Sequence, residues 1–248
     1  SSAASDVYKR QGMHRLGFQP EDVPEVCRRL KEQSGVVARS VFSHLVGSDS
    51  YIFDDFTKKQ LDTFTRVAAE LEAGLEYKVI KHILNSAGIE RFTDYQMDMV
   101  RLGIGLYGVS ASGQKGLRNI STLKTTILQI QNVPAGDSIG YSRMSYVKRD
   151  SRIAIIPIGY ADGLDRKLGC GRAYCLVNGR RAPYVGNICM DVCMIDVTDI
   201  DCREGDTAII FGDDLPVTVL SDAVGTIPYE ILTGVSARVK SCLLYTSD

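Results

Sequence analysis

The residues of this sequence best suited to chemistry are three tyrosines that follow a glycine or a proline, in the pairs Gly140-Tyr141, Gly159-Tyr160 and Pro228-Tyr229. A phenol donates or accepts a hydrogen bond, and a phenolate takes up a proton. A tyrosine beside a glycine is more often a packing residue. Three of them at loop positions, together with Arg101 and the hydroxyl of Ser86, nevertheless favour a site for a phosphorylated ring compound.

The apolar run Val100–Gly108 contains one charged residue, Arg101, and three glycines. Glycine lacks a Cβ and lets main-chain N–H groups approach a ligand closely, as an anion-binding turn requires. The alternative is a buried final strand whose arginine reaches solvent. The pattern by itself leaves both interpretations open.

The histidines His14, His44 and His82 each stand at the end of a predicted strand, where α/β proteins usually place their active sites. A lone histidine at such a position is more often a structural hydrogen-bonding residue than a catalyst. Because no two of them have the H-x-x-x-H spacing and the carboxylates form no ligand pattern, we expect no metal site. Nucleophile elbows, Walker loops and a G-x-G-x-x-G before a helix are also absent from the sequence.

Composition indicates an ordinary soluble protein. The 248 residues are 44% hydrophobic and 24% charged, and the formal net charge of -1 argues against a nucleic-acid partner. The seven cysteines are an odd number without a C-x-x-C pair, which indicates reduced thiols and a cytoplasmic location. No apolar run approaches the roughly 20 residues of a membrane span, and no signal peptide is recognised.

The first hundred residues alternate between apolar runs and amphipathic stretches, which predicts parallel βαβ units in an open sheet or a barrel. Predicted strands cover residues 12–18, 36–42, 77–82 and 97–106; predicted helices begin near residues 19 and 54, the second ending at Gly74, and Asn85 and Ser86 open a short helical turn.

After Gly108 the pattern becomes mostly β, with Asn178-Gly179 as a strong hairpin signal. The predicted strands there cover residues 122–133, 153–158, 173–177, 190–197, 207–211 and 235–239, with one helix over 216–225.

The two ends do not match the interior. Residues 1–11 and 242–248 resemble translated adapter sequence and are left out of the fold prediction. We expect a partial barrel over 12–113 and a β domain over 114–241.

Seven interior segments resemble, in the correct order, the C-terminal two-thirds of a bacterial alanine racemase. They are GMHRLGF (12–18), HILNSAG (82–88), VRLGIGLYG (100–108), IGYS (139–142), IPIGYADG (156–163), APYVGNICMD (182–191) and IPYEILTGVSARV (227–239). The resemblance implies an α/β plus all-β fold, in which the C-terminal part of a pyridoxal 5′-phosphate-binding (β/α)8 TIM barrel precedes a β-rich C-terminal domain. It also implies a homodimer whose active sites are shared between subunits.

The resemblance assigns cofactor roles to seven residues. Arg101 would face the pyridine nitrogen, and His82 would stack on or bond the ring region. The phosphate would be held by hydroxyls and main-chain N–H groups, with an asparagine adjacent; these residues are Ser86, Gly103, Ile104, Tyr229 and Asn85.

Four residues receive substrate roles from the resemblance. Tyr141 would be the base that removes the α-proton of L-alanine, acting from the opposite subunit. Met190 would bind the substrate carboxylate through its main-chain N–H, with Asp191 alongside. Tyr160 would narrow the entrance, which favours a methyl side chain. The activity implied is the interconversion of L-alanine and D-alanine, which supplies D-alanine for peptidoglycan.

The chain departs from the family pattern at two points. Asn187 stands where the family often has an arginine, and no lysine here matches the Schiff-base lysine of the family, so we expect this chain by itself to be inactive. A non-catalytic dimerising β module, or a related pyridoxal-phosphate enzyme such as a serine-preferring racemase, remains an alternative. A parent fused to a D-alanyl-D-alanine-adding ligase is a further possibility that the sequence leaves open.

Overall fold

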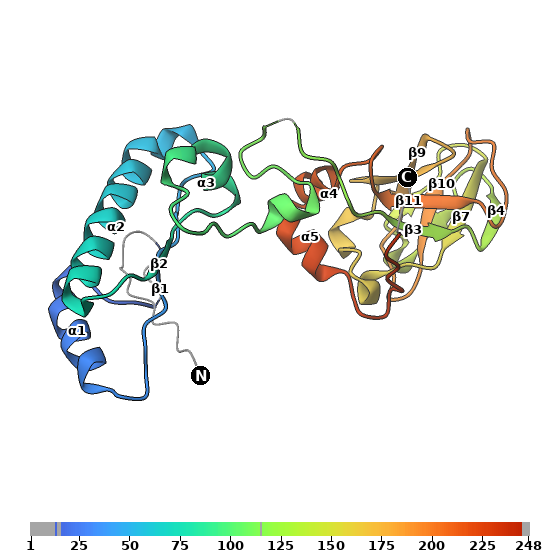
Figure 1. The fold of residues 1–248 in the computed structure, drawn as a ribbon. Helices are drawn as coiled ribbons and strands as arrows, with labels where there is room; N and C mark the ends of the chain where they lie inside the picture. Colours follow the sequence, from blue (N-terminus) through green and yellow to red (C-terminus); the bar gives the residue numbers. More distant parts are fainter. Residues whose placement is uncertain (1–12, 14–15, 115, 245–248) are drawn as a thin grey trace. The chain divides into compact units, whose positions relative to one another are not determined.

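The computed structural model describes residue 13, residues 16–114 and residues 116–244. The chain forms two compact units, which divide between Arg118 and Asn119 (Figure 1). Within the described ranges, no helix is long and apolar enough to cross a membrane. The adapter-like residues 1–11 and His14 lie outside the described residues; at the other end, Leu243 and Leu244 are exposed.

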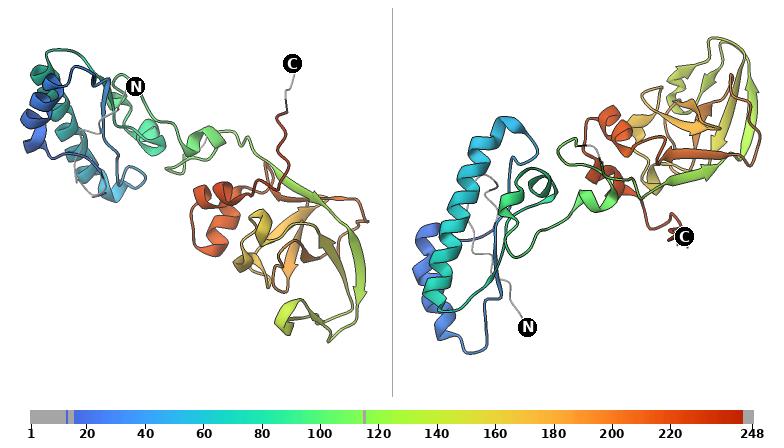
Figure 2. Two further views of the ribbon diagram at one scale, coloured as in Figure 1. Left: turned by 90° about the horizontal axis from the view of Figure 1, so that it is seen from below. Right: turned by 45° about the horizontal axis from the view of Figure 1, so that its top comes forward.

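The first unit consists of short parallel strands and the helices that cover them (Figures 1 and 2). Strands β1 and β2 pair in parallel, with Ser40 opposite Ile80 and Phe42 opposite His82. Helices α1 and α2 pack against each other and bury most of their apolar positions, as the helical spacing predicted, whereas Phe56 is 43% exposed. The element bounds are η1 Pro20–Asp22, α1 Val23–Glu32, β1 Ser40–Phe42, η2 Tyr51–Phe53, α2 Asp54–Leu75, β2 Ile80–His82, α3 Ser86–Arg91, η3 Thr93–Tyr95 and η4 Ile104–Tyr107.

Of the strand expected over 12–18, the described residues, 13 and 16–18, are not in a strand; residues 12, 14 and 15 lie outside the described residues. The strand expected over 97–106 is wrong. The segment 97–106 makes separate main-chain bonds from Asp98 to Lys81 and from Arg101 to Leu84, and then turns at Gly103 into a 3-10 helix. The ψ of Gly103, -106°, lies outside the extended range that a strand requires. The glycines therefore make a turn here.

Gly74 does not end α2, contrary to expectation. The helix continues to Leu75, and Glu76 closes it in the left-handed conformation with a φ of 65°. A Cβ on Gly74 would lie 2.5 Å from the Sγ of Cys27 on α1. Gly74 is therefore the residue that allows the two helices to approach closely.

Glu72 connects the end of α2 to β2. Its carboxylate accepts hydrogen bonds from Lys78 Nζ at 2.9 Å, Lys81 Nζ at 3.0 Å and the N–H of Val79 at 3.1 Å. Burial would raise the pKa of Glu72, but these hydrogen bonds outweigh it and lower the pKa from 4.5 to about 2. The ionised carboxylate thus fixes the loop between helix and strand.

The second unit is mostly antiparallel β structure. Within residues 119–244, seven strands form a sheet in the order β3-β11-β8-β9-β10-β7-β4, and β5 pairs with β6 as a separate ribbon. The strand bounds are β3 Leu123–Thr126, β4 Gln129–Val133, β5 Ser138–Ile139, β6 Ser145–Tyr146, β7 Ser151–Ile156, β8 Tyr174–Val177, β9 Arg180–Val185, β10 Cys193–Asp196 and β11 Thr207–Phe211. The order of the fold, α/β followed by β, is as the sequence predicted.

Two local predictions in the second unit, a hairpin turn and a helix, are confirmed. Asn178 and Gly179 have φ values of 48° and 72°, the type of turn that joins β8 to β9 in a tight hairpin. The helix predicted over 216–225 is α4 (Val217–Val224), with Gly225 as its left-handed cap.

The predicted strand over 235–239 is wrong, and the preceding helix α5 (Pro228–Gly234) was missed. Pro228 occupies the first turn of α5, where the absence of an N–H costs nothing. The chain after α5 turns, with Val239 N–H bonded to Ser236 O. The β-branched residues at 235 and 239 therefore do not pair with a neighbour.

Candidate active site

The ends of β1 and β2 bring an aromatic ring, an imidazole and a guanidinium together. The parallel register places Phe42 beside His82, and their rings stack with centroids 4.9 Å apart and an interplanar angle of 10°. Arg101 Nη1 lies 2.7 Å from His82 Nδ1 and 3.0 Å from His82 O. The guanidinium also lies 5.1 Å from the centroid of Phe42. Arg101 is thus held against the two strand ends.

The contacts of Arg101 determine the tautomer of His82. Arg101 Nη2 donates to the carbonyl oxygens of Ser43 and Ile83. Because a guanidinium has donors and no acceptor, Nδ1 of His82 must present a lone pair to it. Burial, and then the charge of Arg101, lowers the pKa of His82. The imidazole is therefore neutral, and its remaining proton is on Nε2.

Ser86 and the glycine turn form a second cluster in the first unit. Asn85 caps α3, its Oδ1 accepting from the N–H of Gly88 at 2.9 Å. The next residue, Ser86, is buried, and its Oγ accepts from the N–H of Gly103 at 2.9 Å and of Gly105 at 3.3 Å. A hydroxyl that accepts two hydrogen bonds still has its own proton to donate. The cluster offers a hydroxyl donor beside a main-chain turn.

Ile104 follows Gly103 at the start of η4, with its side chain buried at 3% exposure. This anchors the turn in the unit and leaves the main chain, not the side chain, for a ligand. The anion-binding interpretation of the run Val100–Gly108 is thus compatible with the geometry. The alternative, in which Arg101 reaches solvent, conflicts with its contacts to His82 and to main-chain carbonyls.

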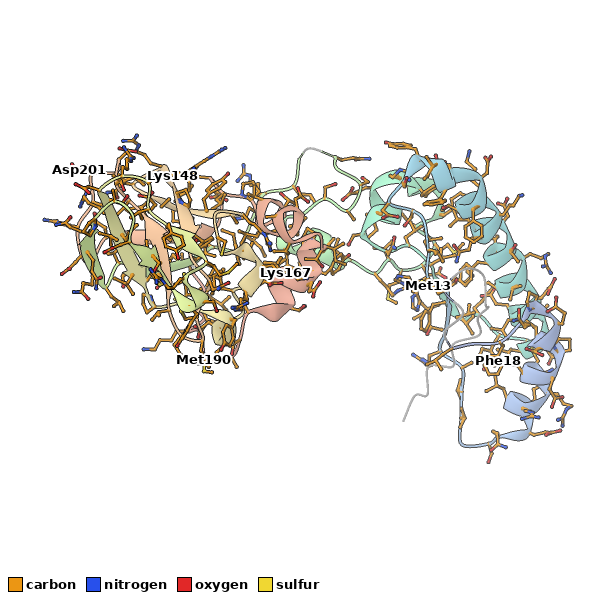
Figure 3. The ribbon with its side chains drawn as sticks, turned by 180° about the vertical axis from the view of Figure 1, so that it is seen from behind. Met13, Phe18, Lys148, Lys167, Met190 and Asp201 are labelled. Carbon is orange, nitrogen blue, oxygen red and sulfur yellow. The ribbon has the colours of Figure 1, made fainter. Side chains whose placement is uncertain are left out.

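In the second unit, Tyr160 and Met190 lie on two loops in direct contact. The N–H of Tyr160 donates to Cys189 O, and the N–H of Ala161 donates to Met190 O, both at 3.0 Å. A Cβ on Gly159 would lie 2.2 Å from Met190 O, so only glycine permits this approach. The side chains of Tyr160 and Met190 are 45% and 53% exposed, and Figure 3 shows Met190 at the surface of its unit.

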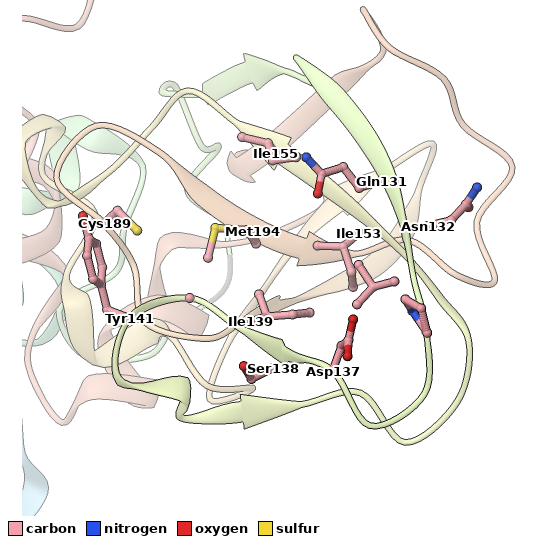
Figure 4. A pocket seen from close by; sticks show the side chains of 13 residues that line it. Gln131, Asn132, Asp137, Ser138, Ile139, Tyr141, Ile153, Ile155, Cys189 and Met194 are labelled. Carbon is pink, nitrogen blue, oxygen red and sulfur yellow. The ribbon is translucent and has the colours of Figure 1, made fainter.

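Tyr141 lies at one end of a cavity of about 720 Å³ in the second unit. It begins the 3-10 helix η5 (Tyr141–Arg143), and its carbonyl accepts from Asn187 Nδ2 at 3.1 Å. Figure 4 shows Tyr141 beside Cys189, with Met194 further along the cavity. The side chain of Tyr141 is 69% exposed, so its hydroxyl is accessible to a substrate.

Tyr229 is the second residue of α5 and is 43% exposed. The structure thus gathers the predicted site residues in separate groups within each unit. The first unit holds the Arg101 and Ser86 clusters, and the second holds Tyr141, the Tyr160 and Met190 loops, and Tyr229.

Across the described residues, no group of three side chains is arranged to hold a metal ion. The clusters described above offer a hydroxyl, main-chain N–H groups and a guanidinium as donors. Such donors match an anionic organic molecule.

Comparison with known protein families shows which family the chain belongs to. Residues 9–111 match the family model "Alanine racemase, N-terminal domain", and residues 120–243 match "Alanine racemase, C-terminal domain". The chain belongs to the alanine racemase family. The two structural units correspond to these two domains, so the expected fold class is confirmed: the C-terminal part of a barrel domain, followed by a β-rich domain.

Individual relatives agree with the family models. The chain is 37% identical to "Alanine racemase 2" of Caldanaerobacter subterraneus subsp. tengcongensis, over 96% of this chain and 63% of that protein. It is also 37% identical to the alanine racemase of Desulfovibrio desulfuricans, over 92% of this chain and 62% of that protein. The chain therefore spans less than two thirds of the length of these racemases.

Solved alanine racemases have the same fold. The structure from the D-cycloserine producer Streptomyces lavendulae superposes with a TM-score of 0.87 at 30% identity, over 96% of this chain and 65% of that one. The structure from Bartonella henselae, which contains covalently bound pyridoxal phosphate, gives a TM-score of 0.82 at 32% identity, over 93% and 63%.

Two residues that contact the predicted racemase site were missed in the sequence. Phe42 stacks on His82, and the parallel register of their strands would have located it. Arg238 bonds to Asp191, 47 residues earlier in the chain. No spacing rule connects residues so far apart.

Proposed function

We propose that the protein to which this chain belongs catalyses the pyridoxal-phosphate-dependent interconversion of L-alanine and D-alanine. The observation that carries the proposal is the Arg101 guanidinium, fixed against a neutral His82 and two main-chain carbonyls, in a chain of the alanine racemase family. That the Bartonella henselae relative binds pyridoxal phosphate covalently supports the choice of cofactor.

The residues present fit this cofactor. Ser86 has a hydroxyl proton to donate, and the turn at Gly103 and Ile104 places main-chain N–H groups beside it, of which that of Gly103 donates to Ser86 Oγ in this structure. Asn85 fixes the start of α3. Hydroxyl and amide donors suit a phosphate dianion. We assign the phosphate to this cluster and to the hydroxyl of Tyr229. When bound, pyridoxal phosphate withdraws electrons from the α-carbon of an amino acid and so makes its proton removable.

Arg101 determines how strongly electrons are withdrawn. A guanidinium keeps its proton at all physiological pH values, so it donates a hydrogen bond to the pyridine nitrogen without protonating it. His82, neutral and buried, holds the guanidinium through Nδ1 and the stacked Phe42 holds His82. A cofactor whose pyridine nitrogen stays unprotonated would withdraw electrons less strongly, which favours return of a proton to the α-carbon over transamination.

Tyr141, Met190, Asp191 and Tyr160 act on the substrate in this proposal. The phenolate oxygen of Tyr141 takes up the α-proton of L-alanine, acting from the opposite subunit of a homodimer. The main-chain N–H of Met190 binds the substrate carboxylate, with Asp191 alongside. Tyr160 narrows the entrance, and the fixed contact between its loop and that of Met190 supports a small side-chain pocket.

We also propose a cytoplasmic location and a role in supplying D-alanine for peptidoglycan. The seven cysteines are unpaired in the structure, which supports a reducing compartment.

The test is enzymatic. The gene is expressed at the full length of its relatives, the protein is saturated with pyridoxal phosphate, and the conversion of L-alanine to D-alanine is measured in parallel with that of L-serine. We expect alanine to be the better substrate by at least about tenfold. Arg101→Lys, which loses the planar fork, should reduce racemisation by about tenfold or more. A protein that binds the cofactor and racemises neither amino acid would refute the proposal.

A further inference from the structure

Arg238 joins two loops of the second unit that carry proposed substrate-contacting residues. Its Nη2 lies 2.6 Å from Asp191 Oδ1, and its Nε lies 3.5 Å from Asp162 Oδ1. Asp191 directly follows Met190, and Asp162 ends the 3-10 helix that begins at Tyr160. One guanidinium therefore bridges the two loops.

Arg238 itself is anchored on the Asp162 side. The N–H of Ser236 donates to Asp162 O at 3.0 Å, and Ser236 Oγ accepts from the N–H of Arg238 at 3.2 Å. Gly163 packs so closely that a Cβ there would lie 2.2 Å from Gly234 O. Asp162 Oδ2 in turn accepts from the main chain of its own turn. The segment with Arg238 and the turn with Asp162 thus form one packed block.

Through Arg238, this block holds the loop that carries Asp191. The side chain of Asp191 is 56% exposed, and in the part of the chain that the structure describes its carboxylate pairs with Arg238. The neighbouring Met190 is 53% exposed, and its main-chain N–H has no acceptor among the described residues. An N–H without an acceptor is suited to a ligand, and its direction depends on what holds the loop. Among the described residues, Arg238 is the side chain that pairs with the Asp191 carboxylate in that loop.

We propose that Arg238 is a positioning residue which, through Asp191, directs the main-chain N–H of Met190 toward the substrate carboxylate. This rests on the proposed function, because it presumes an amino-acid substrate. The planar guanidinium reaches two carboxylates at once, which a lysine ammonium does less well. The pair with Asp191 is half-exposed on both sides and adds little to fold stability, whereas Asp162 is only 13% exposed and belongs to the packed block. The contribution of the Asp191 pair is therefore the placement of the loop.

The first test uses the 248-residue chain and needs no activity. Hydrogen exchange is measured at the amides of Tyr160 and Ala161, which donate to the Met190 loop. In Arg238→Gln these two amides should exchange roughly tenfold faster. Arg149→Gln is the matched control, since it removes another exposed arginine pair, with Asp199, in the same unit. Unchanged exchange in both Arg238→Gln and Arg238→Lys would overturn the proposal.

The second test uses the full-length enzyme with its cofactor. Arg238→Gln should raise KM for alanine about tenfold and change kcat by less than about threefold, since substrate binding is what is weakened. Asp191→Asn should reproduce this effect, and the double variant should be no worse than either single variant. Rescue by Arg238→Lys should be partial. A fall in kcat with unchanged KM would overturn the proposal, whereas a wild-type enzyme without racemase activity would instead refute the proposed function.

Discussion

Gly159→Ala should displace the loop that carries Met190. Gly159 has a φ of -143° and a ψ of -167°, an extended conformation that alanine adopts without strain. The obstacle is steric, since the added Cβ would lie 2.2 Å from Met190 O and 2.4 Å from Cys189 O. Restoring an ordinary contact moves the loop by about 1 Å.

That displacement has a calculable cost. It would stretch the hydrogen bonds from Tyr160 to Cys189 O and from Ala161 to Met190 O, both 3.0 Å, to about 4 Å, beyond hydrogen-bond range. Two lost bonds cost about 0.5–1.5 kcal/mol each. With the strain of overpacking, typically 1–3 kcal/mol, we expect the free energy of unfolding to fall by about 2–6 kcal/mol in total.

The assay is urea unfolding followed through main-chain amide NMR signals of β7 and β10, so that the second unit is monitored by itself. Gly234→Ala is the matched control, because its added Cβ would come no closer than 3.9 Å to Gly163 O. The control should change the free energy of unfolding by less than about 0.5 kcal/mol. Equal stability of the two variants would show that the contact between Gly159 and the Met190 loop is not tight.

Three further predictions concern the first unit. Because the folded-state pKa of Glu72 is depressed to about 2, its contribution to the free energy of unfolding should be present above pH 4.5 and lost as the pH falls toward 2. Denaturation at several pH values should show the free energy of unfolding of wild type falling by about 1–2 kcal/mol more than that of Glu72→Gln. This figure is reduced because the lysine partners are partly exposed to solvent. Asn85→Ala removes the cap on Gly88 and should lower the free energy of unfolding, from urea denaturation, by about 1 kcal/mol, whereas Asn85→Asp should retain most of it. Gly74→Ala should lower the thermal midpoint in wild type and lower it much less in a Cys27→Ala background, because the contact at 2.5 Å with Sγ is then removed and only the Cβ of residue 27, at 3.2 Å, remains; an equal loss in both backgrounds would contradict the packing argument.

The parts of the fold that sequence predicts well are those fixed by local chemistry. The apolar spacing in α2 and the Asn178-Gly179 turn specify their conformation within a few residues. The strands expected over 97–106 and 235–239 failed because an apolar run also fits a glycine turn or an irregular segment. What decides between them is whether a neighbouring strand is available for pairing, and no local pattern records that.

In the candidate site, too, local features could be predicted from the sequence and contacts between distant residues could not. Ser86 and Asn85 could be placed at a helix start from their types alone. The contact of Arg101 with His82, 19 residues away, depends on the register of β1 against β2 and on the turn at Gly103. The link from Arg238 to Asp191 depends on packing between loops. Such contacts follow from tertiary structure and not from spacing.

The central proposal is that the chain belongs to an alanine racemase in which Tyr141 takes the α-proton of L-alanine. The most direct measurement is the exchange of the α-hydrogen with solvent deuterium in the full-length, cofactor-saturated enzyme, starting separately from L-alanine and from D-alanine. Tyr141→Phe keeps the ring and removes the proton-accepting oxygen, so exchange from L-alanine should fall by at least about a hundredfold, the usual range for loss of a general base. Exchange from D-alanine should fall much less. Equal exchange from L-alanine in Tyr141→Phe and in wild type would contradict the proposal.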